Sequence, residues 1–124
     1  MKKQIISSEA PAAIGPYSQA VLVNGMLFVS GQLGLDMKTG EIPESAVEQA
    51  KCSLENIKSI IIDAGGSMDD VVKCSVFLKD MDEFAAMNEV YGEFFNEPYP
   101  ARVTVEVSRL PKDVKVEIEA IAVV

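Results

Sequence analysis

The side chain in this sequence best suited to bind a carboxylate is an arginine in a segment that alternates as a β-strand does. Residues 100–107 are rich in valine, and their period of two predicts a strand. Arg102, Thr104 and Glu106 fall on one face of that strand. The planar guanidinium of arginine binds a carboxylate through two parallel hydrogen bonds. Arg102 is therefore a candidate anion-binding group, and the alternative is a structural ion pair with Glu106 or Glu119.

A second alternating segment, residues 114–124, carries the candidates for proton transfer. Glu117 and Glu119 share one strand face with large apolar residues. A carboxylate beside apolar surface has a raised pKa, which suits a general base that works near neutral pH. Spacing alone makes the two glutamates equal candidates. The alternative for both is solvated charge on a half-exposed strand.

The residue types that are missing narrow the chemistry. The chain has no histidine, which removes the commonest acid–base group and the commonest transition-metal ligand. Any proton transfer must then use a carboxylate, tyrosine, cysteine, lysine or water. Cys52 and Cys74 are far apart, without the spacing of a metal site, and indicate a reducing compartment. We expect no metal and no cofactor.

The length and the net charge of the chain limit which classes of protein it can belong to. A chain of 124 residues predicts one domain, residues 1–124. Its net charge of −8 argues against a nucleic-acid partner, because such proteins carry a basic surface. The apolar stretch near the N-terminus is only Ile5-Ile6, against ~7–15 residues in a signal peptide, and no segment has the length of a membrane span. We expect a cytoplasmic protein with no membrane partner.

Periodicity and turn signals predict the element order β-β-β-α-β-α-β-β. Asn24-Gly25 is a strong hairpin signal, residues 45–48 form a capping box, and Gly65-Gly66 ends the first helix. The second helix is expected to run from residue 80 until Pro98 and Pro100 stop it. The strands are expected at residues 3–7, 19–23, 26–30, 71–79, 100–107 and 114–124.

This order predicts a two-layer α+β domain with one mixed sheet. Right-handed crossovers place both helices on one face of that sheet. The order of the strands stays open: the last two form a hairpin across residues 108–113, or the final strand inserts elsewhere. The uncovered face would expose Ile121 and Val123, and an apolar patch of this kind marks an interface, most simply with further copies of the chain.

Several motifs, in the same order along the whole chain, resemble those of the reactive intermediate deaminase (RidA, or YjgF) family. They lie at residues 10–20, 30–32, 73–80, 84–95, 100–107, 110–113 and 116–122. The resemblance implies a chorismate mutase-like fold and a homotrimer with sites in the clefts between subunits. It implies cofactor-independent hydrolysis of 2-imino or enamino acids, of the 2-aminoacrylate and 2-aminocrotonate type, to 2-oxo acids and ammonia. The corresponding enzyme is a 2-iminobutanoate/2-iminopropanoate deaminase.

The resemblance also implies roles for individual residues. It makes Arg102 the group that holds the substrate carboxylate, and it favours Glu117 over Glu119 as the residue that positions the attacking water. The substrate-binding residues it implies are Tyr17, Ser30, Gly31, Asn88, Arg102 and Thr104.

Each of these further residues has a structural alternative. Tyr17 would otherwise be a core aromatic in a loop, Ser30-Gly31 an ordinary turn, and Asn88 a residue of the helix surface. Thr104 departs from the pattern, because many relatives have cysteine there; a role of the backbone N–H would survive the change.

Two other functions remain as alternatives. The first is a non-catalytic sensor that binds small carboxylates in the same cleft and needs Arg102 but not Glu117. The weaker one is a ribonuclease or translation inhibitor, which the acidic charge and the absence of histidine disfavour.

Overall fold

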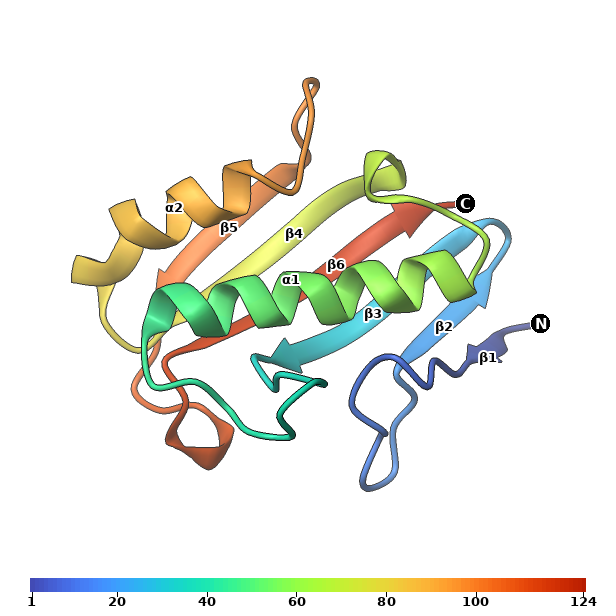
Figure 1. Ribbon diagram of the computed structural model, residues 1–124. Helices are drawn as coiled ribbons and strands as arrows, with labels where there is room; N and C mark the ends of the chain where they lie inside the picture. The colour runs from blue at the N-terminus through green and yellow to red at the C-terminus, as the bar shows by residue number, and fades with distance from the viewer.

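Six strands form one mixed sheet, and two α-helices cover one of its faces (Figure 1). The computed structural model describes residues 1–124. The two-layer α+β prediction is confirmed, with the predicted order of elements. None of the helices combines the length and the apolar composition needed to cross a membrane. The elements are β1 (Lys3–Ile5), β2 (Ala20–Val23), β3 (Met26–Leu33), α1 (Ala46–Asp63), β4 (Val71–Leu78), α2 (Phe84–Gly92), β5 (Ala101–Glu106) and β6 (Val116–Val123).

The last strand inserts into the middle of the sheet, whose order is β1-β2-β3-β6-β4-β5. Strand β6 pairs antiparallel with both β3 and β4, and β5 runs parallel to β4 at the edge. The two last strands therefore do not form a hairpin, which decides the alternative that the sequence left open. Strand β5 keeps one free edge.

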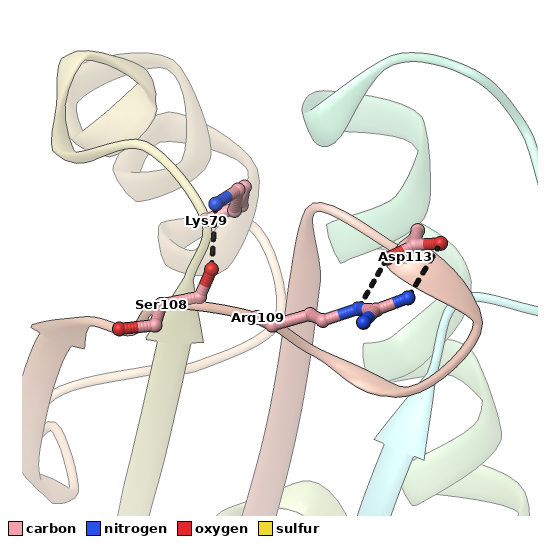
Figure 2. A network of polar contacts seen from close by, with 4 residues as sticks. All are labelled: Lys79, Ser108, Arg109 and Asp113. Atoms are coloured by element: carbon pink, nitrogen blue, oxygen red, sulfur yellow. Dashed lines mark hydrogen bonds and ion pairs between the residues drawn. The ribbon is translucent and has the colours of Figure 1, made fainter.

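The connection from β5 to β6 crosses the end of β4 and is held there by polar contacts. Lys79 Nζ donates a hydrogen bond to the carbonyl of Ser108 at 2.6 Å, and Arg109 Nε forms an ion pair with Asp113 at 2.8 Å (Figure 2). The backbone N–H of Val107 also donates to the carbonyl of Leu78, at 2.8 Å. These contacts direct the chain from the sheet edge to its centre.

The predicted turn at Asn24-Gly25 and the predicted ends of α1 are present, but of the predicted capping box only the Ser45 bond forms. Asn24 and Gly25 both have positive φ, 50° and 77°, as a two-residue turn of type I′ requires. The Ser45 side chain caps α1 by accepting a hydrogen bond from the Glu48 N–H at 3.1 Å. Gly65, with φ of 91°, ends the helix as a left-handed residue.

The prediction for the end of the second helix is wrong. Helix α2 ends at Gly92, six residues before Pro98, and is preceded by a short 3₁₀ turn over Met81–Glu83. Glycine weakens the helix at this point, and the chain turns so that Phe95 packs into the core and Phe94 against it. Packing, not proline, sets the end of this helix.

Alternation along β6 separates the two faces of the sheet. Its even-numbered residues are buried against the helices, among them Ile118, which lies in the same core cluster as Leu54 and Ile57 of α1. Its odd-numbered residues point to the other side, which no helix covers; we call this side the open face. Its exposed apolar residues are Met26, Phe28, Val103, Val105 and Val123. The predicted uncovered apolar face is confirmed, although Ile121, which was expected to be exposed on it, is half-buried.

A buried glutamine fixes the long segment between β1 and β2. The side chain of Gln19 accepts a hydrogen bond from the Ser7 N–H at 2.7 Å. Its amide nitrogen donates to the carbonyls of Ser7, Ala10 and Pro11, at 3.1, 3.3 and 2.8 Å. One side chain thus replaces the backbone partners that this irregular segment lacks.

We predict that Gln19→Ala lowers the free energy of unfolding by about 2–4 kcal/mol, because it leaves buried backbone groups without partners. Urea unfolding at one fixed protein concentration measures the change. Gln4→Ala, which truncates an exposed glutamine of β1, is the control and should stay close to wild type. Equal midpoints for the two variants would contradict this role of Gln19.

Candidate functional site

Arg102 lies on the helix side of the edge strand β5, held against α2. Its Nη1 donates a hydrogen bond to Asn88 Oδ1 at 2.6 Å. Its guanidinium carbon lies 4.7 Å from the centre of the Tyr91 ring and 5.5 Å from that of Phe84. Both distances fall within the range of cation–π attraction. Strand β5 therefore supplies the charge, and α2 supplies the groups that hold it.

No carboxylate of the chain neutralises Arg102. The only ion pair in the structure joins Arg109 and Asp113, and Glu106 instead accepts a hydrogen bond from the Met81 N–H at 2.8 Å. The alternative of a structural ion pair with Glu106 or Glu119 is therefore wrong. Because Asn88 is the one hydrogen-bond acceptor that the guanidinium meets, its remaining N–H groups are available to an external anion.

Two hydroxyl groups near Arg102 are buried without a hydrogen-bond partner, Thr104 Oγ1 and the Tyr91 hydroxyl. Thr104 lies two residues further along the same face of β5. Burial, and the neighbouring Cys74 thiol, raise the pKa of Tyr91, so that its hydroxyl stays neutral. Burial likewise raises the pKa of Cys74, which disfavours the thiolate that a nucleophile needs.

Glu117 lies half-buried on the open face, at the centre of the sheet. Burial is the main reason that its pKa is raised, and the negative charge of Glu119 adds to the effect. Glu119 is itself exposed. The structure thus distinguishes two glutamates that spacing left equal, and the more buried one has the property expected of a general base.

The carboxylate of Glu117 lies directly against the backbone of Gly31. The pairing of β3 with β6 is irregular between Val29 and Gln32, and Gly31 falls in this bulge. A methyl group added at Gly31 would overlap Glu117 Oε2 and lie 2.9 Å from its Cδ. The glycine is needed here for space: its missing side chain leaves room for the carboxylate.

Ser30 joins this bulge to the loop that presents Tyr17. The Ser30 hydroxyl donates to the carbonyl of Ser18 at 2.6 Å, and its N–H donates to the carbonyl of Gln19 at 2.9 Å. Tyr17 is 53% exposed, so the alternative of a core aromatic is wrong. The loop turns at Gly15, whose φ is 126°.

The predicted site residues form two groups that one chain does not bring together. In the sheet, Arg102 is paired with Cys74, and Cys74 is paired with Ala120, so the three side chains all lie on the helix side. Glu117 is an odd number of residues from Ala120 and so points to the opposite face. One group contains Arg102, Asn88 and Thr104, and the other contains Tyr17, Ser30, Gly31 and Glu117. No cluster of three or more histidine, cysteine, aspartate or glutamate side chains suits a metal ion.

Phe84 and Tyr91 are not among the site residues predicted from the sequence. Their contact with Arg102 follows from the parallel pairing of β5 with β4, which brings the edge strand beside α2. The spacing of 84, 88 and 91, close to successive helical turns, was the available signal.

We predict that Glu117→Gln makes the protein more stable than wild type at neutral pH. The raised pKa means that the folded protein disfavours the charged carboxylate, so wild-type stability falls as pH rises from the ordinary carboxyl pKa through the raised value. Glutamine lacks this titration. The gap between the urea midpoints should therefore open with rising pH and close in acid.

Glu89→Gln, which makes the same change at an exposed residue of α2, is the control for this measurement, and its urea midpoint should stay close to that of wild type. A constant offset between wild type and Glu117→Gln at all pH values would contradict the assigned pKa shift.

Several known proteins resemble this chain in sequence and in fold. Residues 7–124 match the family model described as Endoribonuclease L-PSP. A RutC family protein of Pyrococcus abyssi is 57% identical, with 98% of each chain covered. The 2-iminobutanoate/2-iminopropanoate deaminase of Escherichia coli K12 is 52% identical, over 99% of this chain and 98% of that protein. The crystal structure of E. coli TdcF with bound serine superposes with a TM-score of 0.93, at 52% identity and 98% coverage of both chains.

The match extends over nearly the whole chain in both sequence and fold, and the predicted resemblance is confirmed. The chain belongs to the reactive intermediate deaminase (RidA, YjgF) family.

Proposed function

We propose that the protein is a cofactor-independent deaminase that hydrolyses small 2-imino and enamino acids to 2-oxo acids and ammonia. The observation that carries this proposal is the unpaired guanidinium of Arg102, held in place by α2 with no carboxylate of the chain to neutralise it. Such a group fits the carboxylate of a small substrate. The deaminase activity in the name of the E. coli relative supports the reaction class.

The mechanism needs only residues that the chain provides. Arg102 holds the substrate carboxylate and thereby places C2 of the imine. Glu117 takes a proton from water as the water oxygen bonds to C2, and the π electrons move to nitrogen. Glu117 then returns the proton to that nitrogen. Glu117 next moves the hydroxyl proton of this adduct to the amino nitrogen, and as the C–O π bond forms the C–N bond breaks, which releases ammonia and leaves the 2-oxo acid. In the single chain, burial raises the pKa of Glu117, which is the direction that suits a general base.

We further propose that the site lies between subunits of a homotrimer. Arg102 and Glu117 lie on opposite sides of the sheet in one chain, so a neighbouring copy must supply one of them. The exposed apolar residues of the open face support burial against such a copy. Tyr17, Ser30 and the Gly31 backbone would then line the side of the cleft that carries Glu117, with Thr104 beside Arg102. The two free cysteines are consistent with the cytoplasm.

A non-catalytic carboxylate sensor is the second candidate, because Arg102 alone suffices to bind such a ligand. The bound serine named for the TdcF structure supports binding of a small amino acid. A ribonuclease, suggested by the description of the family model, is disfavoured by the net charge of −8 and the absence of histidine.

We predict that replacing either proposed catalytic residue removes most turnover. A threonine or serine dehydratase supplies the imine, and 2-oxo acid formation is followed with and without the protein. Glu117→Gln keeps its shape but accepts no proton, and should lower kcat by roughly 10²–10⁴-fold. Arg102→Lys lacks the planar two-point grip and should lower kcat/KM by at least about 10²-fold.

Two variants serve as matched controls. Arg109→Lys changes the other arginine of the chain, and Glu119→Gln changes the neighbouring glutamate; both should retain activity. A large loss in Glu119→Gln with none in Glu117→Gln would assign the base to Glu119. If wild type leaves imine hydrolysis at its rate in buffer yet binds 2-oxobutanoate, the protein is the sensor.

We predict that the two inactive variants complement each other. Arg102→Lys and Glu117→Gln chains, unfolded together in equal amounts and refolded, form mixed trimers. A site that takes its arginine from one chain and its glutamate from the next is intact in about a quarter of random cases. About a quarter of wild-type activity should therefore return. Equal activity before and after mixing would show that both residues act from one chain.

A further inference from the structure

Three residues on one face of α2 contact a single side chain of the edge strand, Arg102. Phe84, Asn88 and Tyr91 are spaced by four and three residues, so they lie on one side of the helix. All three contact the guanidinium of Arg102. We call these three residues the α2 clamp.

The α2 clamp constrains the guanidinium in two ways. The rings of Tyr91 and Phe84, with centres 4.7 and 5.5 Å from the guanidinium carbon, limit where the cation can move without losing attraction. The hydrogen bond to Asn88, at 2.6 Å, fixes its rotation. Arginine has many rotamers, and a side chain ordered before binding loses less entropy when the ligand arrives.

The ring of Tyr91, and not its hydroxyl, is the part that acts on Arg102. Tyr91 is only 5% exposed, and its hydroxyl has no hydrogen-bond partner. A tyrosine hydroxyl is neutral at physiological pH, and burial raises the pKa of Tyr91 further, so it gives no ion pair to the arginine. A phenylalanine in this position would keep the ring contact with Arg102 and remove only the buried hydroxyl beside Cys74.

We propose that Phe84, Asn88 and Tyr91 are positioning residues that hold the guanidinium of Arg102 in its binding geometry before a small carboxylate arrives. The inference deepens the proposed function, because it rests on Arg102 as the carboxylate-binding group. It gives Phe84 and Tyr91 a role in ligand affinity, in addition to their role in packing α2.

The sequence allows a direct test of how ordered the Arg102 side chain is before a ligand binds. Arg102 and Arg109 are the only arginines in the chain. Protein labelled with ¹⁵N-arginine therefore gives two side-chain Nε–H signals, and Arg109, in its ion pair with Asp113, serves as the internal reference. Relaxation of the two signals reports the side-chain order of each arginine in the intact assembly, without any ligand.

We predict that Tyr91→Leu lowers the order parameter of Arg102 Nε to below about 0.6, the range of flexible groups, and leaves Arg109 unchanged. Asn88→Ala should act in the same direction; because Asn88 is exposed, this variant tests the clamp even if Tyr91→Leu fails to fold. Tyr91→Phe, which keeps the ring, is the matched control and should leave both arginines as in wild type.

Titration with 2-oxobutanoate tests whether the side-chain order of Arg102 affects ligand binding. In wild type the ligand should shift the Arg102 signal and not the Arg109 signal, and Tyr91→Leu should weaken its Kd about tenfold while Tyr91→Phe stays within about twofold. Unchanged Arg102 order in both Tyr91→Leu and Asn88→Ala would overturn the clamp, as would an equal loss of order at both arginines. A clamp confirmed by relaxation but with no ligand shift at Arg102 would instead reject the proposed function.

Discussion

The register of the central strand β6 is the constraint on which the rest of the structure depends. Its even-numbered residues pack against α1, and its odd-numbered residues, Glu117 among them, face the other side. A slip of one residue would exchange the two sets, moving Glu117 into the core and leaving Ile118 in solvent. Pairing with β3 on one side and β4 on the other holds this register at both edges of the strand.

Polar groups of α1 secure the same register from the helix layer. The hydroxyl of Ser53 donates to the carbonyl of Gln32 at 2.8 Å, and the amide of Asn56 donates to that of Leu35 at 3.0 Å. Gly34 allows the close approach, because a Cβ there would meet the backbone of Gln49 at 2.6 Å. These contacts anchor the chain just after the bulge at Ser30 and Gly31, against which the carboxylate of Glu117 lies.

Within a single chain, the sheet keeps Arg102 and Glu117 from forming an ion pair. A guanidinium beside a carboxylate in one chain would form a permanent ion pair, and it would also lower the carboxyl pKa. With the sheet between them, Arg102 keeps donors free for an anion, and Glu117 keeps a raised pKa. In the proposed trimer, the same arrangement makes the site depend on assembly, because neither face is complete by itself.

The sequence by itself determined the elements, the two-layer class and the composition of each strand face, because these follow from interactions between residues near in sequence. The Asn24-Gly25 turn, the Ser45 cap and the alternation of β6 all act locally, and each was predictable. Motif order also pointed to the family, and with it to Arg102 and Glu117.

Only the tertiary structure decided the strand order, the end of α2 and the surroundings of the site residues. The insertion of β6 between β3 and β4 and the packing of Phe95 beyond Gly92 depend on contacts between distant segments. The difference in burial between Glu117 and Glu119, and the α2 clamp around Arg102, arise in the same way. Periodicity predicts on which side of a helix or strand a residue lies. The burial of that residue, its pKa and its contact partners depend on what the fold packs against that side.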